Sequence, residues 1–405
     1  MKGFTLIKLS ALTWAVWAGS VAAQKAPQLA LTPPMGWNSW NHFECAIDEK
    51  TVRQMADLLV SSGMKDAGYQ YINIDDCWHG ERDNNGNIQA HPTHFPSGIK
   101  ALADYVHSKG LKLGIYSDAG AKTCAGKPGS RGYEYQDAKQ YAQWGVDYLK
   151  YDWCNTEGLN AKGAYTTMRD ALHATGKPIV LSICEWGDNK PWLWGKDIGH
   201  LWRTTGDIYN CWDCEHDHGT WSSWGVLKIL DMQEGLRQYA GPGHWNDPDM
   251  MEVGNGMSAS EDKAHFSLWA MLAAPLIAGN DLRSMSKETL AILSNKDVIA
   301  VDQDKLGIQA FKYKTEPGLE YFFKPLENGE WAMLILNRSD DSQRVRFDWR
   351  NEKVVDELFK RSADFATIEY KVKDLWSKQQ SSSKTLLQLT IPRHDVVMYR
   401  LTPKT

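Results

Sequence analysis

Hydrophobic positions repeat one unit along most of the chain, from about residue 33 to residue 304. Each unit is a short apolar run, a polar loop, and a segment whose apolar residues recur every three or four positions. Short apolar runs predict buried strands, and the longer periodic segments predict amphipathic helices. We expect strands at residues 35–38, 71–75, 112–117, 148–151, 179–183, 201–204 and 275–278, with another around Trp245.

The predicted helices alternate with these strands. In residues 49–62, Val52, Met55 and Leu59 share one helical face. Further segments with this helical spacing are residues 99–109, 134–144, 161–173 and 225–239. Eight strands that alternate with helices predict an α/β fold, a parallel (β/α)8 TIM barrel with the helices outside.

The pattern changes after about residue 306. Short segments with alternating polarity follow one another, and turn signals such as Glu327-Asn328-Gly329 separate them. They lie at residues 319–324, 331–337, 344–349, 386–391 and 396–401. We therefore expect a catalytic barrel over residues 24–306 and a C-terminal antiparallel sheet domain over residues 307–405.

Residues 1–23 have the features of a secretory signal peptide. Lys2 and Lys8 precede an apolar run, which ends in the small residues Val21-Ala22-Ala23. No later segment approaches the ~20 apolar residues that cross a bilayer, so no membrane association is expected after removal of the signal. The sequence predicts a secreted or periplasmic protein, and the modest net charge of −5 does not point to nucleic acid.

Acidic residues gather at the predicted strand ends. Active sites of parallel barrels form at the carboxyl ends of the strands. The acids there are Asp75, Asp76, Asp118, Asp152, Glu185, Asp207, Asp247 and Asp249, and the two basic residues among them are Lys150 and Arg203. Burying so many carboxylates is costly unless they are used. Without metal-ligand spacing, they suit acid–base chemistry on a neutral polar substrate such as a sugar, and no cofactor is needed; a solvated charged rim is the alternative.

The sequence of this domain resembles glycoside hydrolase family 27, which contains α-galactosidases and α-N-acetylgalactosaminidases. The resemblance covers nearly everything after residue 23 and rests on seven motifs in order. These are PMGWNSW at 34–40, IDDCW at 74–78, GLKLGIY at 110–116, LKYD at 149–152, CEW at 184–186, WRTTGD at 202–207 and WNDPDM at 245–250. In this family an antiparallel β-sandwich follows the barrel, which implies the same for residues 307–405.

The resemblance implies roles for the two central carboxylates. Asp152 matches the family nucleophile and Asp207 the general acid/base, so hydrolysis would proceed by double displacement with retention. Lys150 lies two residues before Asp152, and side-chain alternation puts both on one face of the strand. Its positive charge would keep Asp152 ionised.

Other matched positions would bind the sugar. Asp75 and Asp76 would accept hydrogen bonds from O6 and O4, and Trp37 would form a wall under the ring. Glu185 and Arg203 would flank the 2-position, and Tyr116, Trp186 and Asp249 would line the pocket. Glu185 favours galactose, because the N-acetylgalactosaminidases carry small residues there.

These roles imply an exo-acting enzyme that removes terminal α-galactosyl residues from oligosaccharides, galactomannan or glycoconjugates. An α-N-acetylgalactosaminidase or a β-L-arabinopyranosidase on the same scaffold is the alternative within enzymes. A non-catalytic galactose-binding protein and a metal-dependent hydrolase are alternatives of other classes. The C-terminal domain could support a homo-oligomer.

The chain has seven cysteines, an odd number, so at least one has no partner within it. The resemblance implies the pairs Cys45–Cys77 and Cys124–Cys154, and it leaves Cys184 over. Cys211 and Cys214 belong to a segment with His216 and His218 that departs from the family; export favours a disulfide there over a zinc site or two free thiols. Because this segment follows Asp207, we expect it to shape the leaving-group side of the site.

Overall fold

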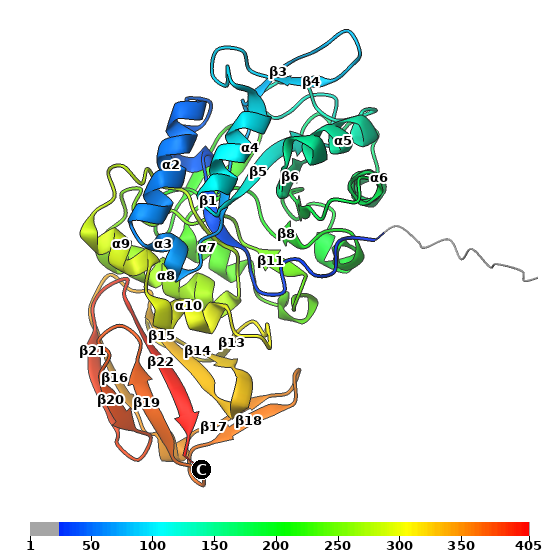
Figure 1. Ribbon diagram of the computed structural model, residues 1–405. Coiled ribbons are helices and arrows are strands. Elements are labelled where there is room, and N and C mark those ends of the chain that lie inside the picture. The colour runs from blue at the N-terminus through cyan, green and yellow to red at the C-terminus, as the bar shows by residue number, and fades with distance from the viewer. Residues whose placement is uncertain (1–23, 405) are drawn as a thin grey trace, which may run out of the picture.

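A computed structural model describes residues 24–404, so the predicted signal peptide lies outside the described residues. Its larger part is a curled sheet of eight parallel strands in the order β11-β8-β7-β6-β5-β2-β1-β12 (Figure 1). A bridge between Met251 and Ala278 links the segment after β11 to β12. The strands are β1 (Met35–Asn38), β2 (Tyr71–Asn73), β5 (Lys112–Asp118), β6 (Tyr148–Asp152), β7 (Val180–Ile183), β8 (Leu201–Arg203), β11 (Trp245–Asp247) and β12 (Leu276–Ala278). The predicted TIM-barrel fold is confirmed.

Helices form the outer layer of this barrel (Figure 1). The longer ones are α2 (Glu49–Ser61), α4 (Gly98–Ser108), α5 (Glu134–Trp144), α6 (Ala161–Ala174) and α8 (Ala259–Leu272). The shorter ones are α1 (Trp40–Phe43), α3 (Met64–Ala67), α7 (Val226–Asp231), α9 (Lys287–Leu293) and α10 (Lys296–Asp302). Side chains cap several of them: Asp48 accepts from the Thr51 N–H before α2, and Ser258 and Glu261 form a capping box on α8.

One predicted helix is too long. The apolar spacing over 225–239 predicted a single helix, but α7 ends at Asp231. Gly235 has a left-handed φ of 81°, and the chain forms only a short 3₁₀ turn at Arg237–Tyr239. A left-handed residue cannot continue an α-helix, so the apolar spacing extends beyond the end of the helix.

The C-terminal domain is antiparallel, as predicted. Its main sheet has the order β13 (Phe311–Glu316), β14 (Leu319–Pro325), β15 (Trp331–Asn337), β22 (Val396–Pro403), β19 (Tyr370–Asp374) and β20 (Gln380–Ser382). Two further strand pairs are β16 (Gln343–Phe347) with β21 (Leu387–Ile391), and β17 (Lys353–Asp356) with β18 (Arg361–Asp364). In β15, Leu334 and Leu336 join the barrel core, and Met333 and Ile335 join the sandwich core. The sheet therefore separates two cores, and its barrel side packs against α8.

Two hairpins extend from the carboxyl ends of barrel strands. One is β3 (His79–Arg82) with β4 (Ile88–Ala90), after β2. The other is β9 (Glu215–Asp217) with β10 (Ser222–Trp224), after β8. Neither was predicted from the sequence, because both are largely polar and lack an apolar alternation.

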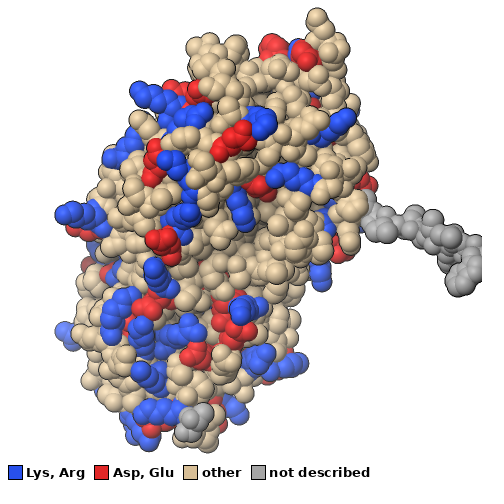
Figure 2. All heavy atoms as spheres, in the orientation of Figure 1, with Lys and Arg blue, Asp and Glu red and all other residues tan. Residues whose placement is uncertain are grey.

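The surface carries charges of both signs. On the face in Figure 2, lysines and arginines are interspersed with aspartates and glutamates over both domains. Within residues 24–404, no helix combines the length and the apolar character needed to cross a membrane.

Candidate active site

Inward-pointing side chains from the barrel strands converge on one small region. Because side chains alternate along a strand, β6 turns Tyr148, Lys150 and Asp152 to the same side. Tyr148 and Lys150 help to line a cavity of about 30 Å³. Its lining residues are Asn38, Asn73, Tyr148, Lys150, Ser182, Cys184, Arg203, Asp247, Asp249, Met250 and Ile277. The expected gathering of charged strand-end residues is therefore present.

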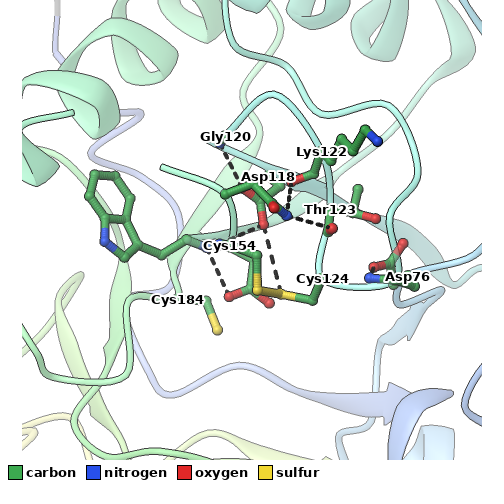
Figure 3. Close-up of a disulfide and its surroundings, with 12 residues drawn as sticks. Asp76, Asp118, Gly120, Lys122, Thr123, Cys124, Cys154 and Cys184 are labelled. Carbon is green, nitrogen blue, oxygen red and sulfur yellow. Dashed lines mark hydrogen bonds between the residues drawn. A yellow bond between two sulfur atoms is a disulfide. The ribbon is translucent and has the colours of Figure 1, made fainter. Parts of the chain in front are cut away.

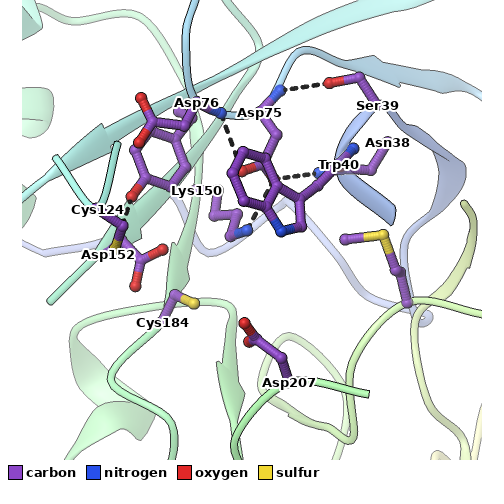
Figure 4. A network of polar contacts seen from close by, with 12 residues as sticks. Asn38, Ser39, Trp40, Asp75, Asp76, Cys124, Lys150, Asp152, Cys184 and Asp207 are labelled. Carbon is purple, nitrogen blue, oxygen red and sulfur yellow. Dashed lines mark hydrogen bonds and ion pairs between the residues drawn. The ribbon is translucent and has the colours of Figure 1, made fainter. Parts of the chain in front are cut away.

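Lys150 and Asp75 form the centre of a polar network (Figure 4). The Lys150 Nζ donates to Asp75 Oδ2 at 2.7 Å, and Asn38 Nδ2 donates to the same oxygen at 2.8 Å. The second oxygen, Oδ1, accepts from the Asp76 N–H at 2.9 Å. Lys150 also lies 5.3 Å from the centre of the Tyr116 ring. A buried carboxylate with this many donors is held in one orientation.

Asp152 lies at the end of β6 and is only 5% exposed. Its Oδ1 accepts from the Trp153 N–H at 3.0 Å. Burial raises the pKa of Asp152 to about 6, the positive charge of Lys150 opposes this rise, and the negative charge of Asp207 adds to it. Figure 4 shows Asp152, Cys184 and Asp207 around a common open space. The two carboxylates predicted to be catalytic thus interact electrostatically.

Asp207 follows β8 and is held by Arg203. The Arg203 Nη2 donates to Asp207 Oδ1 at 2.9 Å and lies 2.9 Å from Asp249 Oδ2. Asp249 is buried, and its two oxygens also accept from the N–H groups of Ile208 and Met250. The Asp207 side chain is 36% exposed, in contrast to the 4% of Arg203. Asp207 is therefore the accessible end of a buried ion-pair network.

Asp76 lies beside the disulfide between Cys124 and Cys154 (Figure 3), and Tyr116 contacts the same disulfide. The Asp76 oxygens accept from the N–H groups of Cys77 and Ala125, at 2.7 Å and 2.9 Å. The Tyr116 hydroxyl lies 3.3 Å from Cys124 Sγ. The bridge ties the loop after β5 to the loop after β6, and both loops border Asp152.

Asp118 supports the same two loops. It is fully buried and accepts from the N–H groups of Gly120 and Cys154, at 2.6 Å and 2.9 Å (Figure 3). Burial and the nearby charge of Asp152 raise the pKa of Asp118 to about 8. Its bonds to loop backbone indicate that it positions the chain around Asp152 and does not face a ligand.

Glu185 lies just after the carboxyl end of β7. Its Oε2 accepts from the backbone and side-chain nitrogens of Asn189, at 2.6 Å and 2.7 Å. Its Oε1 is buried and has no hydrogen-bond partner among residues 24–404. Burial raises the pKa of Glu185 to about 7. Trp186, which follows with a left-handed φ of 57°, is partly exposed. An unsatisfied buried acceptor of this kind suits a ligand hydroxyl.

Trp37 does not lie where the sequence interpretation expected it. Its neighbour Asn38 points into the barrel, so alternation turns Trp37 outward, toward the helices. The indole is 0% exposed, its Nε1 donates to the Asn280 carbonyl at 2.8 Å, and its ring packs against Phe43. The structure does not support a wall under a sugar ring at Trp37.

Trp40, in the same motif, lies beside the polar network instead. It is partly exposed at the start of α1, and Figure 4 shows its ring beside Lys150 and Asp75. Its N–H donates to Asn38 Oδ1 at 2.8 Å. The same sequence motif contains both tryptophans, and they can be distinguished only by knowing which side chains of β1 point into the barrel.

Sequence reasoning also missed residues that complete the site. Asn38 orients Asp75, and the Cys184 thiol lies 3.8 Å from Arg203 Nη1. Asp247, which the strand-end pattern does identify, accepts from the Asp249 N–H at 3.0 Å. Burial raises the pKa of Asp247 to about 6. The strand-end pattern identifies Asp118 and Asp247 as acids of this region, but it assigns neither of them a role.

The cysteines form three bridges. Cys45 pairs with Cys77, Cys124 with Cys154, and Cys211 with Cys214, and Cys184 is free and buried. With both sulfurs of the last pair in a disulfide, the zinc alternative for this segment loses its thiolate ligands. Disulfides are typical of proteins in oxidising compartments.

Two family models match the chain. The model described as alpha galactosidase A matches residues 32–304, and that for the alpha galactosidase C-terminal beta sandwich domain matches residues 316–401. The chain belongs to this family, glycoside hydrolase family 27. The C-terminal match also identifies the antiparallel domain as a β-sandwich.

Relatives extend the match over almost the full length. The chain is 63% identical over 383 residues to "Alpha-galactosidase A" of Cellvibrio japonicus, which covers 95% of each chain. The crystal structure of alpha-galactosidase I from Mortierella vinacea is 37% identical, with a TM-score of 0.86 over 93% of this chain and 98% of that one. The alpha-galactosidase from Saccharomyces cerevisiae with raffinose is 30% identical, with a TM-score of 0.83 over 93% and 99%.

Proposed function

We propose that this chain is a retaining, exo-acting α-galactosidase in which Asp152 is the nucleophile and Asp207 the general acid/base. The α-galactosidase activity itself follows from the family and from a relative at 63% identity. The observation that carries the mechanism is the asymmetry of the two carboxylates: Asp152 is buried beside Lys150, and Asp207 is accessible and held by Arg203.

In the first step, a carboxylate oxygen of Asp152 attacks the anomeric carbon. The bond from that carbon to the leaving oxygen breaks, and Asp207 gives its proton to this oxygen. Lys150 supports the attack, because its positive charge opposes the rise that burial causes in the pKa of Asp152.

In the second step, Asp207 accepts a proton from a water molecule, whose oxygen attacks the anomeric carbon. The ester bond to Asp152 breaks, and galactose leaves with its original anomeric configuration. Asp207 suits both proton transfers because its side chain reaches solvent.

The pocket supports galactose as the glycone. We assign Asp75 and Asp76 to the 6- and 4-hydroxyls, Glu185 and Arg203 to the 2-hydroxyl, and Trp40 to the ring face. The unpaired Glu185 Oε1 supports the second assignment, since a 2-hydroxyl would satisfy it. Tyr116, Trp186 and Asp249 complete the lining. Raffinose, bound by the yeast relative, carries a terminal α-galactosyl group, which supports oligosaccharides of this type as substrates.

We also infer export to the periplasm or the medium, with residues 1–23 removed and a barrel over 24–306 followed by a sandwich over 307–405. The three disulfides support an oxidising compartment. Mass spectrometry of the exported protein tests this inference; an N-terminus far from Gln24 would contradict it.

The first experiment compares initial rates on p-nitrophenyl α-galactoside, α-N-acetylgalactosaminide and β-L-arabinopyranoside. We expect the galactoside to dominate, and Asp152→Ala to lower its kcat by a factor on the order of 10⁴ or more. Proton NMR of the first turnovers should show the α-anomer of galactose. A β-anomer as first product would contradict retention, and a faster reaction with either other sugar would overturn the pocket assignment.

A further inference from the structure

The hairpin after β8 carries a row of stacked rings. His216 stacks on Tyr209 with ring centroids 4.6 Å apart and an interplanar angle of 2°. His218 stacks on Trp221 at 3.7 Å and 11°, and the two histidines meet edge to face at 4.5 Å. The row is thus Tyr209, His216, His218 and Trp221, and we call it the ring ladder.

The outer rings of the ladder face solvent. Tyr209 is 40% exposed and Trp221 is 50% exposed. In each case the stacked histidine covers one face, so the exposed area includes the other face. Leaving large aromatic surfaces in water forgoes a favourable burial, which is a reason to look for a ligand.

The ladder is attached to the proposed general acid. The Trp224 N–H donates to the Asp207 carbonyl at 3.0 Å, and the Tyr209 N–H donates to the Trp224 carbonyl at 2.8 Å. Ile208 between them is buried, so alternation puts Asp207 and Tyr209 on the same side of this extended segment. Positions two apart on an extended chain are separated by about 6.6 Å, which is comparable to the width of a sugar ring.

Exposed aromatic residues are concentrated on this end of the barrel. Within residues 24–404, the largely exposed ones are Tyr133, Tyr135, Tyr209 and Trp221, and all of them follow the carboxyl end of a barrel strand. Arg82 covers the ring of Tyr133. The sandwich instead exposes the aliphatic side chains of Val355, Leu358 and Ile368.

We infer that the ring ladder is a binding subsite for the leaving group, and that it takes a pyranose ring of an oligosaccharide or polysaccharide. Tyr209 receives the sugar next to the scissile bond, and Trp221 receives one farther along. The apolar face of a sugar ring packs on an aromatic ring, which gives affinity without strict selection of hydroxyls. This inference rests on the proposed function and adds to it the class of leaving group.

The test compares two substrates that both need a proton from Asp207. Methyl α-galactoside has no ring in its leaving group, and an α-galactoside of mannotriose has three. For Tyr209→Ala and Trp221→Ala we expect kcat/KM on the mannotriose substrate to fall by about 5- to 30-fold, with less than about 2-fold change on the methyl glycoside. Tyr209→Phe and Trp221→Phe should keep most of the activity, because they keep a ring.

Tyr135→Ala, a matched exposed aromatic outside the hairpin, should leave both substrates unchanged. Equal losses on both substrates would overturn the inference, since the ladder would then act only by holding Asp207 in place. No loss on either substrate would overturn it as well. Failure of the unmodified enzyme to hydrolyse methyl α-galactoside would count against the proposed function and not against the ladder.

Discussion

The polar network around Asp75, Lys150 and Asp152, here called the floor of the barrel, and the ring ladder would border the same scissile bond in the proposed reaction, but they are built differently. On the floor, Asp75 and Lys150 are buried and joined by short, directional hydrogen bonds. On the ladder, the rings of Tyr209 and Trp221 are exposed and stack on His216 and His218. Directional bonds discriminate between positions of hydroxyl groups, whereas ring faces accept many sugars. The molecule thus combines a strict site for the sugar that is cleaved off with a tolerant surface for the rest of the substrate.

The largest effect should come from the floor. In Lys150→Met, the buried carboxylates of Asp75 and Asp152 lose their shared cation, so we expect kcat/KM to fall on the order of 10³-fold. The fall should be equal for methyl α-galactoside and for the mannotriose substrate, in contrast to the ladder variants. The acid limb of the pH profile should also move to higher pH, because Lys150 opposes the rise in the pKa of Asp152.

Lys162→Met is the control for Lys150→Met, because Lys162 is exposed on α6. It should be fully active. Thermal unfolding of both variants separates lost chemistry from lost folding. A Lys150→Met enzyme that is folded and retains most of its activity would contradict the assigned role of this charge.

Glu185 should control the sugar at the 2-position. In Glu185→Ser, galactose loses an acceptor, and we expect kcat/KM on p-nitrophenyl α-galactoside to fall about 10- to 100-fold. The shorter side chain leaves room for an acetamide, so the ratio of N-acetylgalactosaminide to galactoside rates should rise. Glu185→Gln, which keeps the volume, should lose activity without this change in ratio. An unchanged ratio in Glu185→Ser would contradict this role of Glu185 and would mean that other residues recognise the 2-position.

The pH profile of the unmodified enzyme should have an acid limb near pH 6. Protonation of Asp152 below its raised pKa of about 6 would remove the proposed nucleophile, so kcat/KM should fall tenfold per pH unit below that value. α-Galactosyl fluoride needs no proton on its leaving group, so it should keep the acid limb and lose dependence on the general acid at high pH. An acid limb that disappears with the fluoride would assign it to a group other than Asp152.

The charged floor could be predicted from the sequence, because two simple rules act together there. Parallel barrels put their sites at strand ends, and the acids Asp75 and Asp152 follow apolar runs directly. The pairing of Lys150 with the carboxylates also follows from alternation, since it lies two residues before Asp152.

The direction of Trp37 could not be predicted in the same way. All four residues of β1 are buried, polar Asn38 included, so no alternation of buried and exposed positions marks which face of the strand points into the barrel. Only the contact of Asn38 with Asp75 shows that Asn38 faces into the barrel and that Trp37 therefore faces outward. Trp40, not Trp37, is then the tryptophan beside the polar network. The ring ladder has a different obstacle: β9 is exposed along its whole length, so no periodicity predicts that His216 in this strand and His218 just after it stack on Tyr209 and Trp221.

The smallest expected effect concerns the free energy of unfolding. It tests whether the buried negative charge of Asp152 destabilises the folded state. The pKa of Asp152 rises on folding from its ordinary 3.8 to about 6. Below pH 3.8 the group is protonated in both states and contributes nothing; above pH 6 its buried charge destabilises the folded state fully. Asp152→Asn should therefore raise the free energy of unfolding by about 1–2 kcal/mol at pH 7.5, because the amide still loses some hydration on burial.

The gain from Asp152→Asn should vanish near pH 4, which thermal or urea unfolding at the two pH values can measure. Asp83→Asn provides the opposite sign, because hydrogen bonds from Asn87 lower the pKa of the exposed Asp83, so its substitution should destabilise slightly at pH 7.5. A gain for Asp152→Asn that persisted at pH 4 would trace the effect to packing and not to charge. A gain confined to high pH would mean that the floor keeps Asp152 ionised at a cost in folding stability. The ladder consists of stacked rings and needs no buried charge, so it carries no such cost.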